Sequence, residues 1–174
     1  MILSIIAAIA NNNEIGMKNE LLWDLPIDMK HFRETTTSHP VIMGQKTFES
    51  LGVGPDGTQG KTLPNRRNII ITLNKDFKKE DTEVVNSLDE LDRLLESTMG
   101  DNEEAFIIGG GQIYKLLISK ADKLYITHVN ADFPDADTFF PTIDSDEWEK
   151  MSEDKHEKDD KNIYDCNFVV YERR

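Results

Sequence analysis

The chain has 174 residues, of which 38% are hydrophobic and 30% charged, and its formal net charge at pH 7 is −13. This length favours one domain, residues 1–174, with a sizeable core. The negative charge argues against nucleic acid and anionic membrane surfaces as partners. No apolar run approaches the roughly 18 residues that a membrane span needs.

The first apolar run, MILSIIAAIA, ends in Ala8-Ile9-Ala10, which imitates a signal-peptidase site. The run is short and has no positively charged leader, so it indicates a buried first strand and not a signal peptide. Cys166 is the only cysteine. It cannot form an internal disulfide, which favours a reducing, cytoplasmic location. Its surroundings, YDCNFVVY, are typical of a late strand, so we prefer an unreactive cysteine to a catalytic thiol.

Apolar runs alternate with helical patterns along the chain. The runs are rich in Ile and Val, which predicts strands buried on both faces, at 2–10, 40–43, 69–73, 105–108, 124–129 and 163–171. Helical patterns start at Pro26, after Gly44, at the capping-box sequence Ser87-Leu88-Asp89-Glu90, and after Gly111. The last run alternates in polarity, which suits an antiparallel end strand. The pattern predicts an α/β fold with a mostly parallel mixed sheet flanked by helices and an antiparallel C-terminal strand.

Charge is distributed unevenly. Acidic residues crowd positions 132–160, which indicates a solvated face; a salt-rich habitat is the alternative, although lysine is not depleted. Because the chain is otherwise acidic, a cluster of basic residues is a candidate anion-binding site. This cluster comprises Lys61, Arg66, Arg67, Lys75, Lys78 and Lys79.

Two predicted strands end in glycine and lead into helical patterns, at Gly44 and at Gly109-Gly110-Gly111. Each junction could present backbone N–H groups and a positive helix end to a phosphate. Neither matches G-x-G-x-x-G or the Walker pattern, and a glycine after a strand is usually only a tight turn. Two such junctions suggest a ligand with more than one phosphate.

The stretch WDLPIDMKHF, Trp23 to Phe32, contains an unusual acid. An acid in the first turn of a helix is ordinarily explained by the helix dipole. The spacing 25, 28, 32 nevertheless puts Asp28 on the apolar face with Leu25 and Phe32. A buried carboxylate needs a partner, and clefts use such residues to hold cationic or amidine-like groups.

The chain resembles the dihydrofolate reductase family nearly from end to end. The resemblance rests on the order and spacing of short segments: Ile6-Ala7-Ala8, Ile15-Gly16-Met17, LLWDLPID at 21–28, PVIMG at 40–44, TFESLG at 47–52, LPNRRN at 63–68, IGGGQIY at 108–114, YITH at 125–128 and Phe140-Pro141. It implies NADPH-dependent reduction of 7,8-dihydrofolate to tetrahydrofolate, with hydride transfer to C6 and protonation of N5, in the service of one-carbon metabolism.

The resemblance also implies site residues. Asp28 corresponds to the carboxylate that hydrogen-bonds the pterin 2-amino group and N3, while the N5 proton arrives through water. Trp23 and Thr127 match positions that organise water and this carboxylate, and Arg66 matches the arginine that grips the α-carboxylate of the glutamate tail. The implied ring contacts, which also suit a simple core, are Ile6, Ala7, Met29, Phe32, Leu51, Leu63, Ile108 and Tyr114. Diaminopyrimidine and pteridine antifolates are expected to bind through Asp28.

The cofactor implied by the resemblance is NADPH, with no metal. The implied contacts are Ala8, Ile15, Gly16, Gly44, Gln45, Lys46, Thr47, Ile71, Thr72, Ile108, Gly110, Gly111, Gln112, Ile113 and Tyr114. Gly109-Gly110 falls where the family has a cis peptide bond. Residues 11–24 match the mobile loop that closes over nicotinamide. Asp137 matches the acid that steadies this loop in some members, although an exposed loop acid is an equal alternative.

The sequence departs from the family pattern at three places. Gln45 and Gln112 replace arginines that face the cofactor 2′-phosphate and its surroundings; Lys46, Thr72, Asn74 or Lys75 are the candidates to compensate. We still expect NADPH over NADH. Leu22 replaces a proline that is common in bacterial members. The segment Val53–Thr62 is several residues longer than usual and is positioned to cover the glutamate tail or a neighbouring chain.

Three functions are weighed. A dihydrofolate reductase, expected to be a cytoplasmic monomer, fits all the motifs. A reductase of the same fold acting on a related ring, such as the pyrimidine reductases of the riboflavin pathway, fits less well because Asp28 with Arg66 suits a pterin with a glutamate tail. A non-catalytic nucleotide- or pterin-binding protein would not need the full set of Trp23, Asp28, Arg66 and Thr127.

Overall fold

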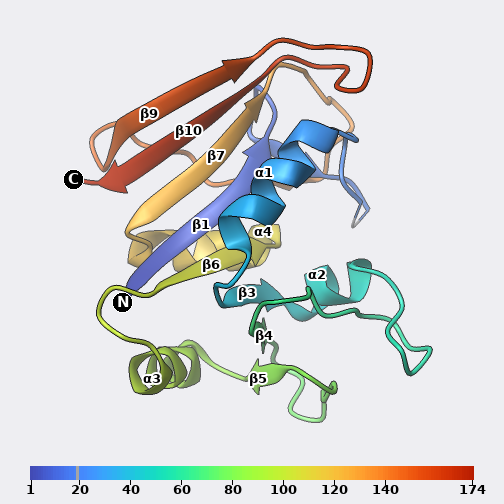
Figure 1. Ribbon diagram of the computed structural model, residues 1–174, viewed down its shortest axis with the longest axis vertical. Helices are drawn as coiled ribbons and strands as arrows, with labels where there is room; N and C mark the ends of the chain where they lie inside the picture. Colours follow the sequence, from blue (N-terminus) through green and yellow to red (C-terminus); the bar gives the residue numbers. More distant parts are fainter. Residues whose placement is uncertain (19) are drawn as a thin grey trace.

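The computed structural model describes residues 1–18 and 20–174 and is built around a large sheet (Figure 1). Its strands are β1 (Ile2–Ile9), β3 (Val41–Gly44), β4 (Asn68–Ile71), β5 (Glu83–Val85), β6 (Glu104–Gly109), β7 (Lys123–Val129), β9 (Trp148–His156) and β10 (Cys166–Arg173). They lie in the order β5-β4-β3-β6-β1-β7-β10-β9. β10 is antiparallel to both of its neighbours, and the remaining pairs are parallel. The predicted α/β class and antiparallel C-terminal strand are therefore confirmed.

The strand β1 explains why apolar runs without alternation mark the centre of the sheet. Ile5 and Ile9 belong to one hydrophobic cluster, whereas Ile6 belongs to another on the opposite face. Helices cover the cluster on each face of the sheet, so successive side chains of β1 are buried on both faces. The first strand is buried along most of its length, as the sequence predicts.

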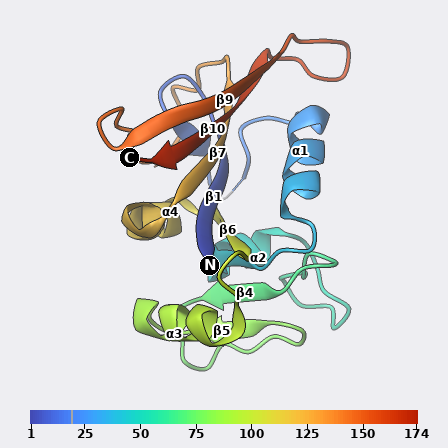
Figure 2. The same cartoon turned by 60° about the vertical axis from the view of Figure 1, so that its left-hand side comes forward.

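The helices are α1 (Pro26–Thr36), α2 (Gln45–Ser50), α3 (Leu88–Thr98) and α4 (Gly111–Leu117), followed by a 3₁₀ turn at Ile118–Lys120. Leu91 of α3 and Leu117 of α4 pack in the cluster of Ile5, whereas Phe48 of α2 packs with Ile6. Figure 2 shows α1 and α4 on opposite sides of the sheet. No helix among the described residues has both the length and the apolarity that a bilayer crossing requires.

The capping box at the start of α3 is formed largely as predicted. The Ser87 hydroxyl accepts a hydrogen bond from the Glu90 N–H at 3.1 Å. The Glu90 carboxylate turns back and accepts from the N–H of Asn86 at 2.7 Å. Leu91 and Leu95 are buried on one face of the helix, which is the amphipathic pattern read from the sequence.

The C-terminal part of the sheet corrects the predicted boundaries. The last strand begins at Cys166 and not at 163, because Ile163 is 59% exposed in the preceding loop. The edge strand is β9, which was not predicted because nearly all of its side chains are exposed. Backbone pairing with β10 forms β9, so its side chains carry no hydrophobic signal. The short strands β5, β2 (Glu14–Gly16) and β8 (Thr138–Phe139) were likewise missed.

Candidate functional site

A cavity of about 360 Å³ opens beside the carboxyl ends of β1 and β6. Walls come from β1, α1, α2 and α4, which are adjacent only in the folded chain. The predicted residues that line it are Ile6, Ala7, Ala8, Ile15, Gly16, Asp28, Met29, Phe32, Lys46, Thr47, Leu51, Ile108, Gly110, Gly111 and Tyr114. The fold therefore brings most of the expected substrate and cofactor residues to one cavity.

Other predicted residues lie outside this lining. They are Trp23, Gly44, Gln45, Leu63, Arg66, Ile71, Thr72, Gln112, Ile113 and Thr127. Conversely, the sequence analysis did not single out Glu20, Leu21, Ser50 and Thr138 as contacts, although all four line the cavity. Each of them is next to a segment or residue that the resemblance had marked, so proximity in sequence was the available signal.

The carboxylate of Asp28 faces the cavity from the first turn of α1. Burial raises the pKa of Asp28 above its ordinary value, and a hydrogen bond with the Thr127 side chain acts in the opposite direction. Thr127 lies in β7 and is 2% exposed. Removing water from a carboxylate favours its neutral form, and a hydroxyl donor favours the ionised form. The apolar face carrying Asp28 thus lines a cavity, as its spacing predicted.

The first turn of α1 is capped from a distant loop. Leu25, at the N-cap position, provides no side-chain hydrogen bond. The N–H of Ile27 donates to Oδ1 of Asn162 at 2.9 Å, across 135 positions of sequence. Asn162 is itself held by Asp159, whose Oδ1 accepts from the Asn162 backbone N–H at 2.8 Å. This cap fixes the turn that carries Asp28, and no local sequence signal at Leu25 announces it.

We expect Asn162→Ala to lower the free energy of unfolding by about 1 kcal/mol, because it leaves the Ile27 N–H without its acceptor. Asn162→Asp keeps an acceptor oxygen for the Ile27 N–H, but it replaces the amide that donates to Asp159 by a second carboxylate, so it should also be less stable than the parent at neutral pH. Urea unfolding followed by circular dichroism measures both values. The control is Asp160→Ala, at an exposed neighbour. Equal losses in the alanine variant and this control would contradict the capping role.

At the other end of α1, Thr36 holds Arg66. Nη1 of Arg66 donates to the Thr36 hydroxyl oxygen at 2.9 Å, and the same hydroxyl donates to the Phe32 carbonyl at 2.9 Å. Burial and the nearby Arg33 guanidinium lower the pKa of Arg66. Among the described residues, neither arginine has a carboxylate within ion-pair distance. Two guanidinium groups without a carboxylate favour binding of an anion.

The turn that carries Arg66 is shaped by Asn68. Its amide donates to the carbonyls of Leu63 and Arg66 at 3.0 and 2.9 Å, and its Oδ1 accepts from the Leu63 N–H at 2.8 Å. Asn68 is buried, so this amide satisfies backbone groups that water cannot reach. No pattern in the sequence marks Asn68 or Arg33 as functional, because their roles depend on a turn that packs against α1.

The geometry of α1 defines the shape of a suitable ligand. Asp28 and Thr36 are separated by eight helical residues, or about 12 Å along the axis. The half-buried side chain of Phe32 lies between them, on the same side of the helix. This arrangement fits an elongated molecule with a hydrogen-bonding, amidine-like edge at one end, a ring in the middle and an anionic group at the other end.

The two glycine–helix junctions are neighbours in the sheet. Gly44 precedes α2 and Gly110 precedes α4, and Met43 pairs with Gly109 across β3 and β6. The Gly109–Gly110 peptide is cis, as the resemblance implied. A Cβ on Gly111 would stand 2.7 Å from Cγ2 of Thr138. Position 111 therefore has no room for a side chain, and its exposed backbone allows a phosphate group to approach closely.

The predicted basic cluster is divided by the fold. Arg67 forms two hydrogen bonds with Glu83, and Lys79 pairs with Asp56 at 2.8 Å. These two cations are already paired with carboxylates, so the cluster does not offer all of its charges to one anion; Arg66 has no such partner among the described residues. Lys46 lines the cavity instead.

Gln45, the first residue of α2, is held by two side-chain hydrogen bonds. Its Nε2 donates to Glu49 at 2.8 Å, and its Oε1 accepts from the Thr72 hydroxyl at 2.6 Å. The side chain of Asn74 accepts from the Asp76 N–H at 3.0 Å. Of the residues expected to compensate for missing arginines, Thr72 and Asn74 are thus engaged within the protein. Gln112 is exposed.

The segment 11–24 is fastened to the loop that leads into β8. The N–H of Lys18 donates to Oδ2 of Asp137 at 2.9 Å, and the Asp137 N–H donates to the Gly16 carbonyl at 3.2 Å. The backbone N–H of Lys18 and the Thr138 hydroxyl lower the pKa of Asp137. Asp137 thus makes the contact that the resemblance implied. Asn19, within the expected mobile loop, lies outside the described residues.

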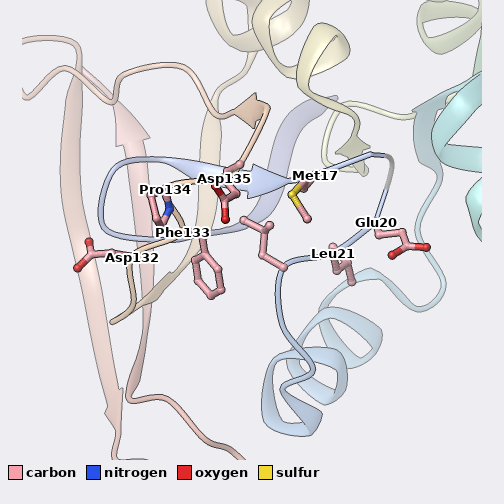
Figure 3. Close-up of a pocket in the computed structure, with 9 residues that line it drawn as sticks. Met17, Glu20, Leu21, Asp132, Phe133, Pro134 and Asp135 are labelled. Atoms are coloured by element: carbon pink, nitrogen blue, oxygen red, sulfur yellow. The ribbon is translucent and has the colours of Figure 1, made fainter.

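A smaller cavity of about 240 Å³ lies between this segment and residues 132–136 (Figure 3). Met17, Leu21 and Phe133 contribute apolar walls. The Trp23 ring packs against Phe133 with 5.5 Å between centroids. Trp23 therefore anchors the end of the segment 11–24 and does not line the main cavity.

Comparisons with known proteins agree with this geometry. A family model described as dihydrofolate reductase matches residues 2–173. Dihydrofolate reductase type 3 of Salmonella typhimurium is 42% identical over 174 residues, covering 100% of this chain and 99% of the relative. The dihydrofolate reductase of Bacillus subtilis is 40% identical, covering 99% and 95%. A solved structure of the Enterococcus faecalis enzyme, complexed with NADP(H) and RAB-propyl, has a TM-score of 0.85, with 34% identity and coverage of 99% and 96%.

Proposed function

The chain belongs to the dihydrofolate reductase family and has its NADPH-dependent activity, and we propose that Asp28 and Arg66 position 7,8-dihydrofolate for that reaction. The observation that carries the proposal is the pair of recognition groups at opposite ends of α1. The Asp28 carboxylate faces the cavity near the start of the helix. Arg66 is tied to Thr36 in the last turn. No group of three metal-ligating side chains occurs among residues 1–18 and 20–174.

Asp28 orients the pterin ring. Its two oxygens accept hydrogen bonds from the 2-amino group and N3, which fixes the face of the ring and the position of C6. NADPH, when bound, supplies the hydride for C6. The Asp28 charge favours protonation at N5 by water, because a nearby anion stabilises the positive charge that develops on the pterin. Met29, Phe32 and Leu51 enclose the rings in an apolar wall.

The arginine end of α1 binds the glutamate tail. The Nε and Nη1 atoms of Arg66 donate to Pro64 and Thr36, which fixes the guanidinium plane and leaves the N–H groups of Nη2 to donate to a carboxylate. Arg33 adds a second cation close by. A lysine at position 66 would not reproduce the planar, two-pronged arrangement of guanidinium donors that matches a carboxylate.

The cofactor binds along the glycine junctions. Gly110, Gly111, Lys46 and Thr47 line the cavity where backbone N–H groups and one ammonium can approach a pyrophosphate. The tight approach of Gly111 to Thr138 leaves no room for a side chain, which supports the fit. The segment 11–24, held by Asp137, covers the nicotinamide end and excludes water.

The experiment that tests the activity follows the loss of NADPH absorbance with purified protein and dihydrofolate, and then repeats the assay with NADH. Loss of NADPH that depends on dihydrofolate supports the proposed reaction. No loss of either cofactor from folded protein would refute it and favour the related reductase or the binding protein.

We expect the preference for NADPH over NADH to be weaker than in family members that carry arginines in place of Gln45 and Gln112. Gln45 supplies no positive charge and lies beside Glu49. We expect Gln45→Arg to raise the kcat/KM preference for NADPH over NADH by about tenfold, since one charge-assisted contact contributes about 1.4 kcal/mol or more. Steady-state kinetics with both cofactors measures the ratio. Ser119→Arg, which adds the same charge at an exposed position, is the control. An equal change in both variants would contradict a local effect at residue 45.

We also propose how this protein binds antifolates, where it is located and with what it associates. Diaminopyrimidine antifolates bind through Asp28, because their amidine-like edge matches the pterin edge. Cys166 is buried and unpaired, in keeping with a cytoplasmic location. The protein acts as a monomer, without nucleic acid or membrane partners.

A further inference from the structure

The segment Val53–Thr62 closes on itself instead of reaching over the cavity. The Gly54 N–H donates to the Thr58 carbonyl at 2.9 Å, and the Gly60 N–H donates to the Gly52 carbonyl at 2.8 Å. Val53 and Gln59 form an antiparallel bridge. None of the residues 52–62 lines the cavity. The segment therefore forms a closed loop of its own and adds nothing to the walls of this cavity.

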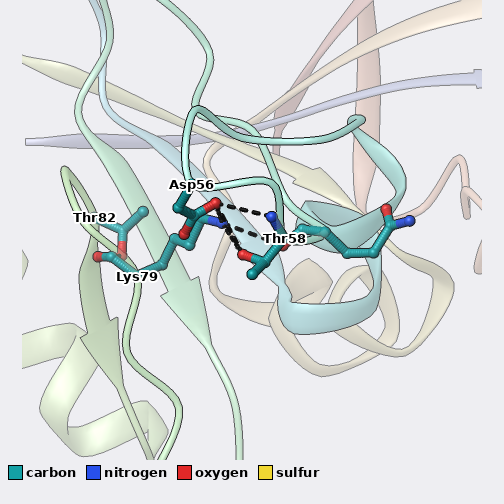
Figure 4. Close-up of polar contacts among 5 residues, drawn as sticks. Asp56, Thr58, Lys79 and Thr82 are labelled. Carbon is teal, nitrogen blue, oxygen red and sulfur yellow. Dashed lines mark hydrogen bonds and ion pairs between the residues drawn. The ribbon is translucent and has the colours of Figure 1, made fainter.

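The Lys79 side chain fastens the segment to the stretch between β4 and β5 (Figure 4). Nζ of Lys79 donates to Oδ1 of Asp56 at 2.8 Å, to the Thr58 hydroxyl at 2.6 Å and to the Gln59 carbonyl at 3.4 Å. Its side chain is only 9% exposed. The three acceptors match the three donors of an ammonium group, so its burial is compensated. We call Asp56, Thr58 and Lys79 the clamp.

The clamp is also closed internally. Oδ1 of Asp56 accepts from the backbone N–H of Thr58 at 3.0 Å and from its hydroxyl at 2.9 Å. Hydrogen bonding from Lys79, followed by that from Thr58, lowers the pKa of Asp56 to about 2. The carboxylate is therefore ionised at every pH at which the protein is expected to act.

Beneath the clamp lies the aromatic residue of α2. Gly60 has φ +99°, and a Cβ there would stand 2.2 Å from Cε1 of Phe48. Phe48 is fully buried, with the Phe77 ring edge-on at 6.3 Å between centroids. The segment 53–62 has little apolar surface of its own to hold it there, since Val53 is 55% exposed. The hydrogen bonds from Lys79 to Asp56, Thr58 and Gln59 therefore hold the segment in place.

The same helix has another surface in the cavity. Lys46, Thr47 and Ser50 of α2 line the cavity, as does Leu51 at its end. The Thr47 hydroxyl lies next to Gly110, since a Cβ on that glycine would stand 3.0 Å from Oγ1. We propose that Lys79 is a positioning residue, which holds Gly60 on Phe48 and so fixes α2 against both the cofactor and the substrate. This inference rests on the proposed function for its ligands, but the fastening itself is independent of it.

The first test measures the fastening without ligands. Lys79→Met should speed hydrogen exchange at the amides of Gly54, Gly60 and Leu51 by about tenfold or more, because these amides are hydrogen-bonded in or beside the segment. Lys78→Met removes the same charge from the exposed neighbour and should leave their exchange unchanged. Unchanged exchange in Lys79→Met would overturn the clamp. Thr58→Val is the milder variant if Lys79→Met does not fold.

The second test measures positioning. In Lys79→Met, KM for dihydrofolate and for NADPH should both rise by about three- to tenfold while kcat stays within about twofold, because ligand contacts are displaced but the reacting groups are retained. Asp56→Asn should give the same pattern, and the double variant should add little to either single one. Faster hydrogen exchange with unchanged KM values would show that the clamp holds only the segment 53–62 and does not affect ligand binding. That result would overturn the positioning role. If the unmodified protein shows no reductase activity, the proposed function fails while the exchange result still decides the fastening.

Discussion

Replacing Asp28 by asparagine is expected to lower kcat by about 10²-fold or more while the fold is retained. The neutral amide offers one acceptor where the pterin edge presents two donors, and it removes the negative charge that stabilises the ring as it gains a proton. Asp28 is the carboxylate that α1 contributes to the cavity, opposite the glycine junctions. The loss should therefore appear in turnover more than in cofactor binding.

The same substitution should not destabilise the protein at neutral pH. Burial raises the pKa of Asp28, so the folded state binds that proton more tightly than the unfolded state does. The ionised group therefore costs stability above its folded pKa, and this cost disappears as the pH falls through that pKa toward the unfolded value. Asp28→Asn should accordingly unfold at the same or a higher urea concentration than the parent at pH 7, with the difference shrinking in acid.

Three measurements check this prediction: single-turnover hydride transfer, NADPH binding and urea unfolding at two pH values. Glu34→Gln is the matched control, because it neutralises an exposed acid on the same helix that does not line the cavity. Near-normal turnover in Asp28→Asn, with the fold verified by circular dichroism, would refute the role assigned to the carboxylate. A strong loss in the control as well would show that general charge and not the cavity is responsible.

Replacing Arg66 by leucine is expected to raise KM for dihydrofolate by about 10²-fold, since the tail carboxylate loses charge-assisted hydrogen bonds of roughly 1.5–3 kcal/mol. The NADPH dissociation constant should stay within about twofold, because Arg66 lies at the Thr36 end of α1, away from the glycine junctions. The remaining Arg33 limits the loss, so a double variant should bind the tail more weakly still.

Dihydropteroate, which lacks the glutamate, separates the tail contact from other effects. The parent and Arg66→Leu should reduce this substrate with similar kcat/KM. Arg67→Leu is the control, because the neighbouring arginine is paired with Glu83 and should leave KM for dihydrofolate unchanged. Equal weakening of dihydrofolate and NADPH in Arg66→Leu would contradict the assignment.

Prediction from sequence succeeded where the signal is local. The unalternating run of β1, the capping residues at Ser87 and the apolar face of α3 each encode their structure in neighbouring residues. The glycine junctions were located for the same reason, since a strand that ends in glycine before a helix is a short pattern. Boundaries failed where tertiary pairing decides them, as in β9, which has almost no buried side chain.

The sequence by itself determined the α/β class, the acid on an apolar face at Asp28, and the motifs that relate the chain to its family. Only the tertiary structure decided that Asn162 caps α1, that Arg33 lies beside Arg66, and that Lys79 is buried against Asp56. The reason is physical. Helical faces, caps and turns depend on residues a few positions apart. These three contacts instead join a loop to α1 or to another loop far away in the sequence, and packing against the sheet fixes their approach. A cation such as Lys79 has the same local sequence whether it binds a ligand or an internal carboxylate, and only the fold distinguishes the two.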